Sequence, residues 1–327
     1  MGLKSCLLGA ALAGVCFCIQ ADEDAARAAE CEPQLAAALP MIESTSSTLL
    51  VPAEIDGKAG SLMVDTGSSY SMMRGSVADE LGLQRDDIPD GVYGLAGRSI
   101  GQRTRAHSLK LGPIVEADRG FLIAPPNVPV DPRALGILGG DVIGDFNVEL
   151  DPMAHQLKLY TADSCPGGVP GWAAKTPPTS IEVTPDNQIV FTAALDGKPV
   201  KAYLDTGATY SILDLSAAKR AYGLDRDSPG LEPVGGTRTG DGAMLDTFLY
   251  HFKQLDVAGV NFSDPLVSLI DERRRAHPDT GTRIDLRVVS LPDFRVGMHQ
   301  LRQLHVYIDY DRRRLYVEPN GPVPDKP

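Results

Sequence analysis

The sequence predicts an all-β fold built from two related lobes, each a closed, barrel-like sheet with only short helices. Three observations support it: 33 glycines and 25 prolines, strand–turn–strand patterns in both halves, and an internal repeat. Glycine and proline at this frequency favour many turns between short strands. The 327 residues are enough for two domains with cores of their own.

The repeat centres on two aspartates, Asp65 and Asp205, one in each half of the chain. Each ends an apolar stretch and is followed by Thr, Gly, a small residue, Ser or Thr, Tyr and Ser. The same Asp-Gly-Lys turn precedes each aspartate at the same distance, at positions 56–58 and 196–198. Because turn and motif keep one register, we infer a duplicated lobe.

The two halves also end alike. A glycine is followed by an aspartate at the same spacing in both, at Gly139 and Asp151 and at Gly297 and Asp309. Each half is predicted to finish there as a strand, a turn and a second strand. Short helices that end at a glycine are expected over 76–83 and 215–224.

These patterns divide the chain into consecutive parts. They are a signal peptide (1–21), an N-terminal segment (22–39), a first lobe (40–163), a linker rich in Pro and Gly (164–178), a second lobe (179–320) and a tail (321–327). The N-terminal segment is rich in Ala and Glu, and we expect a short helix there.

The segment 1–21 carries one lysine, an apolar run from Cys6 to Ile19, and small residues before Asp22. This is the pattern of a secretory signal peptide. The run is too short to span a bilayer comfortably, so we expect cleavage after Ala21 and export to the periplasm or the exterior, with no membrane span left. An uncleaved membrane anchor is the alternative.

Charge and cysteine content narrow the function classes. A formal charge of −12, or −13 once the signal peptide with its lysine is removed, argues against nucleic-acid binding, because acidic surfaces repel phosphate.

Outside the signal peptide only Cys31 and Cys165 remain, and an even pair in an exported protein suggests one disulfide; two free buried thiols are the alternative. CxxC and HExxH are absent from the sequence, so no metal or other cofactor is expected.

The repeated Asp-Thr-Gly has a chemical consequence if an approximate two-fold axis relates the lobes. Asp65 and Asp205 would then meet, and like charges at close range favour a pair that shares one proton. One acid and one base would flank a water molecule, which suits hydrolysis of a carbonyl compound without a metal or a covalent intermediate. One copy of the motif would be an ordinary turn; two copies in register favour a site.

The two motifs, 64–69 (Val-Asp-Thr-Gly-Ser-Ser) and 204–209 (Leu-Asp-Thr-Gly-Ala-Thr), resemble the catalytic loops of aspartic proteases with retropepsin-like lobes, in the pepsin and retropepsin clan. The segments 137–139 (Ile-Leu-Gly) and 295–297 (Arg-Val-Gly) are similar to the family's second motif, an apolar residue and a glycine packed near the catalytic loop. The resemblance implies a bilobal acid-protease fold with both half-sites in one chain. It also implies a monomeric endopeptidase that acts on peptides or proteins.

The resemblance implies roles for the matched residues. Asp65 and Asp205 form the catalytic dyad that activates water and protonates the substrate carbonyl. The threonines hydrogen-bond across the two-fold axis and the glycines let the backbone turn; the supporting residues are Thr66, Gly67, Ser68, Thr206, Gly207 and Ala208. Hairpins with glycines form flaps over the substrate; the candidates are Tyr93, Gly94 and Gly97 in the first lobe and Gly235 and Gly236 in the second.

The repeat departs from symmetry at two places. Ser68 is matched by Ala208, and a hydroxyl here supports the carboxylate in pepsin-like members. Asp65 is therefore expected to be the better stabilised anion, and Asp205 the proton carrier. In the terminal motif, His299 stands where the first lobe has Asp141, so the second lobe has drifted at this edge.

Two other functions stay open. The segment 97–101 (Gly-Arg-Ser-Ile-Gly) fits the G-x-S-x-G pattern of serine hydrolases, but that motif requires a helix after it, and the following residues predict a turn and a strand. The second alternative is a non-catalytic protein that keeps the protease fold and binds peptides or a partner. Retention of both aspartates and both threonines argues against it, and inhibition by a statine-type peptide analogue would decide.

Overall fold

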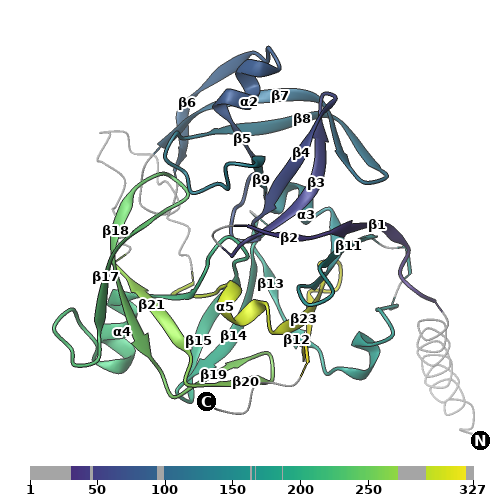
Figure 1. Cartoon of the computed structure of the whole chain (residues 1–327). Coiled ribbons are helices and arrows are strands. Elements are labelled where there is room, and N and C mark those ends of the chain that lie inside the picture. Colours follow the sequence, from purple (N-terminus) through teal and green to yellow (C-terminus); the bar gives the residue numbers. More distant parts are fainter. Residues whose placement is uncertain are drawn as a thin grey trace, which may run out of the picture.

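The computed structural model has the expected all-β, bilobal architecture, with the first lobe at the top of Figure 1 and the second at the lower left. The expected signal peptide and nearly all of the tail lie outside the described residues. The structure describes residues 31–321 except 45–46, 94–98, 163, 166, 186 and 272–291.

The sheet of the first lobe has eight strands in its described part and closes on itself. The closure comes from β3, which pairs with β4 and also with β7, where Ile55 lies opposite Leu109. Alternate side chains of β3 point inward, and Val51, Ala53 and Ile55 are buried. The strand order is β2 (Ile42–Glu43), β3 (Leu49–Ile55), β4 (Lys58–Val64), β9 (Ala134–Leu138), β5 (Met72–Arg74), β8 (Ile114–Ala124), β7 (Ser99–Leu111) and β6 (Arg85–Tyr93).

The sheet of the second lobe repeats this plan. Its β14 pairs with β15 and with β19, where Leu195 lies opposite Leu255, the counterpart of the closing contact in the first lobe. The strand order is β17 (Glu232–Arg238), β18 (Met244–His251), β21 (Leu266–Ile270), β16 (Ser211–Asp214), β22 (Phe294–Val296), β15 (Lys198–Leu204), β14 (Ile189–Leu195), β19 (Gln254–Val257) and β20 (Val260–Ser263), with β13 (Glu182–Val183) paired to β14.

The described helices are short, and two of them lie over the segments 76–83 and 215–224 where the sequence predicts helices. In α4 (Leu215–Tyr222) the Asp214 carboxylate accepts a hydrogen bond from the Ala217 amide at 3.0 Å, which caps the first turn. The helix ends at Gly223, whose φ of 72° a residue with a side chain adopts only with strain. The other helices are α2 (Gly75–Glu80), α3 (Gly140–Ile143), α5 (Met298–Leu301) and the 3₁₀ turn η1 (Ala173–Lys175).

A third sheet, of six strands, joins the lobes. The two terminal hairpins predicted from sequence are present, and they pair with each other through β10 and β23, with Leu150 opposite Val306. The strand order is β1 (Leu35–Pro40), β11 (Gln156–Thr161), β10 (Phe146–Asp151), β23 (Leu304–Asp309), β24 (Arg314–Pro319) and β12 (Thr179–Ser180).

The helix expected over 22–39 is wrong where the structure describes that segment. Residues Leu35–Pro40 form β1, which pairs antiparallel with β11. Burial alternates at the end of this apolar stretch, with Ala37 and Leu39 buried and Ala38 exposed, so tertiary packing overrides the helix propensity of alanine. Just before it, Cys31 and Cys165 form a disulfide with their Cα atoms 5.8 Å apart, which ties this segment to the start of the linker.

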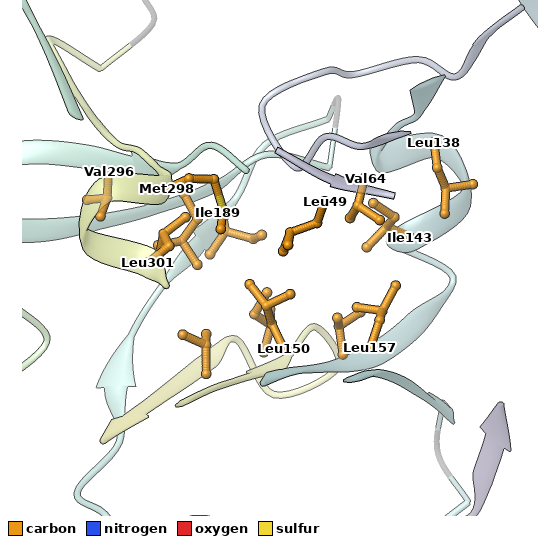
Figure 2. Packing of buried hydrophobic residues seen from close by; sticks show 14 of the residues in the cluster. Leu49, Val64, Leu138, Ile143, Leu150, Leu157, Ile189, Val296, Met298 and Leu301 are labelled. Atoms are coloured by element: carbon orange, nitrogen blue, oxygen red, sulfur yellow. The ribbon is translucent and has the colours of Figure 1, made fainter. Parts of the chain in front are cut away.

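Buried side chains from both lobes and from the joining sheet pack together in one continuous hydrophobic core (Figure 2). Fully buried leucine-sized side chains contribute about 1.5–3 kcal/mol each, so this core holds the lobes in a fixed relation. In Figure 2 the first lobe supplies Leu49, Val64, Leu138 and Ile143, the second supplies Ile189, Val296, Met298 and Leu301, and the joining sheet supplies Leu150 and Leu157.

Polar contacts also cross the joining sheet. His305 of β23 lies between two carboxylates, with Nε2 2.9 Å from Glu149 Oε1 and Nδ1 3.1 Å from Glu318 Oε1. Burial would raise the pKa of Glu149, but hydrogen bonds from His305, Tyr160 and Lys158 outweigh it and lower the pKa to about 2. Burial would lower the pKa of His305, but its two carboxylate partners outweigh it and raise the pKa above 6.5. Both ring nitrogens face carboxylate oxygens, so protonation of His305 gives each carboxylate a charged hydrogen bond and bridges the two halves.

Replacing His305 by Gln is expected to remove a pH-dependent part of the free energy of unfolding, about 1.5–3 kcal/mol. Because the pKa of His305 is raised by folding, its contribution is fully present below about pH 6.5 and is lost as pH rises through the folded-state pKa. Denaturant unfolding between pH 5 and 9 should show a difference between the wild type and His305→Gln that shrinks with rising pH.

The control is His107→Gln, because His107 pairs with Asp56 but has a side chain that is 91% exposed. Exposed pairs contribute little, so this variant should follow the wild type. A pH-independent cost for His305→Gln would show that the ring acts through packing alone.

Candidate active site

The two Asp-Thr-Gly loops meet where the lobes meet. The first follows β4 and the second follows β15, and both strands deliver their aspartate directly from the core. Oδ1 of Asp65 accepts hydrogen bonds from the amides of Gly67 and Ser68, both at 3.0 Å, and Oδ1 of Asp205 accepts one from Gly207 at 3.0 Å. Each carboxyl is therefore oriented by the turn that follows it.

Each carboxyl group lies against the glycine of the opposite loop. A Cβ atom added to Gly67 would lie 2.5 Å from Cγ of Asp205, and one added to Gly207 would lie 2.5 Å from Cγ of Asp65. The two carboxyl groups are joined by a hydrogen bond. The structure thus brings together the aspartates and the glycines that the sequence singled out.

The threonines cross between the lobes in a reciprocal set of four hydrogen bonds. The Thr66 hydroxyl donates to the Leu204 carbonyl at 2.9 Å, and the Thr206 hydroxyl donates to the Val64 carbonyl at 2.8 Å. Each hydroxyl also accepts the amide hydrogen of the other threonine, at 3.0 and 3.2 Å. These buried bonds fix the two loops relative to each other.

The second motif packs directly beneath the loops. A Cβ on Gly139 would lie 2.5 Å from the backbone of Tyr70, and one on Gly297 would lie 2.2 Å from the carbonyl oxygen of Tyr210. Only glycine permits this approach in either lobe.

In the same region, a different residue of each lobe accepts the hydrogen bond of the motif serine. In the first lobe the Ser71 hydroxyl donates to Asp141, and in the second the Ser211 hydroxyl donates to Gln300 at 2.6 Å. Gln300 therefore does what Asp141 does, and His299 instead stacks on Tyr210 with ring centres 5.5 Å apart. Both helices begin directly after the motif glycine, but the partner of the serine hydroxyl comes one residue later in α5 than in α3, which a comparison of letters does not reveal.

The proposed asymmetry between Ser68 and Ala208 is corrected. The Ser68 hydroxyl donates to the Tyr70 carbonyl at 2.9 Å, and the contact with Asp65 comes from the Ser68 backbone amide. Because Ala208 has the same amide, the hydroxyl does not distinguish the two carboxyl groups.

What distinguishes them is Arg295. Its Nη1 lies 3.8 Å from Oδ2 of Asp205, and both side chains are more than nine-tenths buried. Burial raises the pKa of Asp65 to about 7, and the charge of Asp205 adds to that rise. Burial also raises the pKa of Asp205, but Arg295 opposes it, as do loop amides and the hydrogen bond from Asp65. The charge of Arg295 therefore favours the ionised form of Asp205 over that of Asp65, which is opposite to the direction expected from Ser68.

Sequence reasoning passed over two residues that complete the loops. Gln188 is buried and its Nε2 donates to the Gly67 carbonyl at 3.0 Å, so the second lobe supports the loop of the first. It precedes β14, in a turn that carries no motif, and gave no local signal. Arg295 did give a local signal, because it is a charged residue at a motif position that is otherwise apolar.

The flap candidates lie on hairpins. Tyr93 pairs with Ser99 between β6 and β7, while Gly94 and Gly97, at the tip of that hairpin, lie outside the described residues. Gly235 and Gly236 lie within β17, at an irregular step in its pairing with β18, and not at the tip. The tip is the turn before Met244, where a Cβ on Gly242 would lie 3.5 Å from Asn127 of the first lobe.

The structure removes the serine-hydrolase alternative. Ser99 begins the long strand β7, and no helix follows it, so the strand–turn–helix that exposes a nucleophilic serine is not formed.

The described residues hold neither a metal-binding cluster nor a membrane-spanning helix. Residues 31–321, with their gaps, contain no cluster of three or more His, Cys, Asp or Glu side chains able to hold a metal ion. Within the same part of the chain, no helix has the length and apolar character needed to cross a membrane.

The paired loops, their crossed threonines and their glycine supports define a bilobal protein of the aspartic protease type. The chain belongs to the aspartyl protease family, whose model matches it twice, over residues 51–142 and 191–282. No curated protein matches the chain.

Similar solved structures include two basic 7S globulins. Basic 7S globulin from soybean has 10% identity and a TM-score of 0.47, and the match covers 90% of this chain and 100% of that one. Conglutin gamma, a basic 7S globulin from lupine seeds, has 11% identity and a TM-score of 0.47, with 88% of this chain and 95% of that one covered.

Proposed function

We propose that this protein is an aspartic endopeptidase that hydrolyses peptide bonds with a water molecule activated between Asp65 and Asp205. The observation that carries the proposal is the close approach of the two carboxyl groups, one from each lobe, each packed against the glycine of the opposite loop. Two carboxyls held in this way supply an acid and a base at one point.

The chemistry needs only this pair and a water. The ionised carboxyl takes a proton from the water as its oxygen bonds to the carbonyl carbon, and the protonated carboxyl gives its proton to the carbonyl oxygen. In the second half of the reaction the C–N bond breaks as one carboxyl gives a proton to the nitrogen, while the other takes a proton from a hydroxyl of the gem-diol, which forms the carboxylic acid product and restores the dyad. The four threonine hydrogen bonds keep the carboxyls in place throughout, which is the positioning that such catalysis depends on.

The test is digestion of a peptide library at pH values from acidic to neutral by the wild type and by Asp65→Asn. Cleavage that is lost in the variant supports the proposal. The second candidate, a binding protein that retains the fold, would show peptide binding without cleavage in the wild type. A statine-type analogue mimics the tetrahedral intermediate and should inhibit only if the enzyme proposal holds.

The enzyme is proposed to act outside the cytoplasm, because residues 1–21 have the composition of a secretory signal. Amino-terminal sequencing of the protein recovered from the exported fraction of its cells should begin at Asp22. A chain that keeps its first residues and stays with the membrane fraction would favour the uncleaved anchor.

A further inference from the structure

A buried cation stands beside the candidate dyad. Arg295 in β22 is 6% exposed, and among the described residues no other lysine or arginine is buried. Its Nη1 is 3.8 Å from Oδ2 of Asp205, which is itself 7% exposed. Burying a guanidinium is costly unless a carboxylate accompanies it, so the position favours the ionised form of Asp205.

The corresponding place in the first lobe is apolar. There, Ile137 of β9 is the parallel partner of Met63 in β4, while in the second lobe Arg295 is the partner of Tyr203 in β15, in the same register. The Arg295 guanidinium carbon lies 5.9 Å from the centre of the Tyr203 ring. The second lobe has thus replaced an apolar pair by an arginine on an aromatic face, and only one carboxyl group has the charge beside it.

We propose that Arg295 is a positioning residue that holds Asp205 ionised, which makes Asp205 the base that deprotonates the water and Asp65 the acid that protonates the substrate carbonyl. The inference rests on the proposed peptide hydrolysis and assigns the two roles within it. The repeat alone does not say which aspartate is the acid and which is the base, because the two loops are otherwise nearly identical.

Among the described residues, the strands on either side of Arg295 and the opposite loop each place one group near it. On one side β15 presents Tyr203, whose pKa burial raises far above neutrality, so the phenol stays uncharged. On the other side β16 places the apolar Ile212 opposite Arg295. Across the two-fold axis lies Asp65, on which Arg295 acts more weakly than on Asp205.

The test is a ¹³C-carboxyl NMR titration of the whole protein labelled at aspartate, with the two signals assigned from Asp65→Asn and Asp205→Asn. In the wild type, Asp205 should lose its proton at the lower pH. In Arg295→Ile, which installs the first lobe's residue, the lower transition should move up by about one pH unit or more, because an opposite charge at this distance lowers a carboxyl pKa by that amount. Arg295→Lys keeps the charge and should keep the order.

Matched controls keep the result interpretable. Arg220→Ile removes an equal charge from α4, where Arg220 is exposed and pairs with Asp293, and should leave both transitions unchanged. If Arg295→Ile does not fold, Arg295→Met and the double variant Arg295→Ile with Tyr203→Met, which restores the first lobe's pair, take its place. The order in which Asp65 and Asp205 lose their protons in the wild type can be measured without any Arg295 variant.

Two results would overturn the inference: Asp65 losing its proton first in the wild type, or a folded neutral variant with unmoved transitions. If the proposed function also holds, the acidic limb of the pH profile of kcat/KM should move together with the lower of the two carboxyl transitions. Because the titration needs no substrate, a protein that cleaves nothing would refute the hydrolysis while leaving the effect of Arg295 on Asp205 separately measured.

Discussion

Asp65→Asn is expected to lower kcat/KM for peptide hydrolysis by at least about 10²–10⁴-fold, because an amide cannot deliver the proton that the substrate carbonyl needs. The fold should survive, since the Asn side chain is the same size and can still accept the hydrogen bonds from Gly67 and Ser68. Initial rates on a cleaved library peptide, with circular dichroism to check folding, measure both.

The same variant should change how stability depends on pH. The pKa of Asp65 is raised to about 7 in the folded protein from an ordinary value of 3.8. Between these values the folded state keeps a proton that the unfolded state has lost, so wild-type stability falls as pH rises through this window. Asn does not titrate, so the variant lacks this fall and should be more stable than the wild type above pH 7, by on the order of a few kcal/mol.

Asp118→Asn is the control for both measurements, because its side chain is 76% exposed and its ion pair with Arg105 lies at the surface. It should match the wild type in rate and in pH dependence. Full activity in Asp65→Asn would refute the dyad; an unchanged pH slope would refute the raised pKa.

Gly67→Ala is expected to inactivate the enzyme without removing any chemical group. The new methyl would lie 2.5 Å from Cγ and 2.6 Å from Oδ1 of Asp205, so that carboxyl must move away from its partner. A displacement of about 1 Å in a catalytic group can cost about 10²-fold in rate, and we expect a loss of at least this size in kcat. Steady-state kinetics and an inhibitor-binding assay separate loss of turnover from loss of binding.

The matched control is Gly101→Ala. Gly101 lies in β7, and a Cβ there would meet no atom within 4 Å. Its rate should equal that of the wild type. If Gly67→Ala also kept its rate, the two carboxyls would not need the close contact seen here.

The amino-acid pattern was sufficient for the features that repeat. The two lobes, the terminal hairpins and the Asp-Thr-Gly loops were predictable because turn residues and strand periodicity are local and appear twice. The β1 strand was not, because its alanines favour helix in isolation and become a strand only through the pairing with β11.

The chemical inequality of Asp65 and Asp205 depends on three-dimensional contacts. The premise taken from Ser68 fails, because that hydroxyl donates to a backbone carbonyl and not to Asp65. The decisive neighbour, Arg295, lies far beyond Asp205 in the chain and approaches it only once β22 is placed between β15 and β16. Gln188 was missed for the same reason, since its target, Gly67, belongs to the other lobe.

The joining sheet has a consequence for how such a site can evolve. In a site made by two copies of a one-lobe chain, every substitution would be present twice, and an arginine beside one carboxylate would also stand beside the other. Here the hairpin of β10 and β11 from one half and the hairpin of β23 and β24 from the other pair in one sheet within a single polypeptide. Each half can therefore mutate alone. One positive charge can then lie beside only one of the two carboxyl groups, although the two loops that carry them are otherwise related by the two-fold axis.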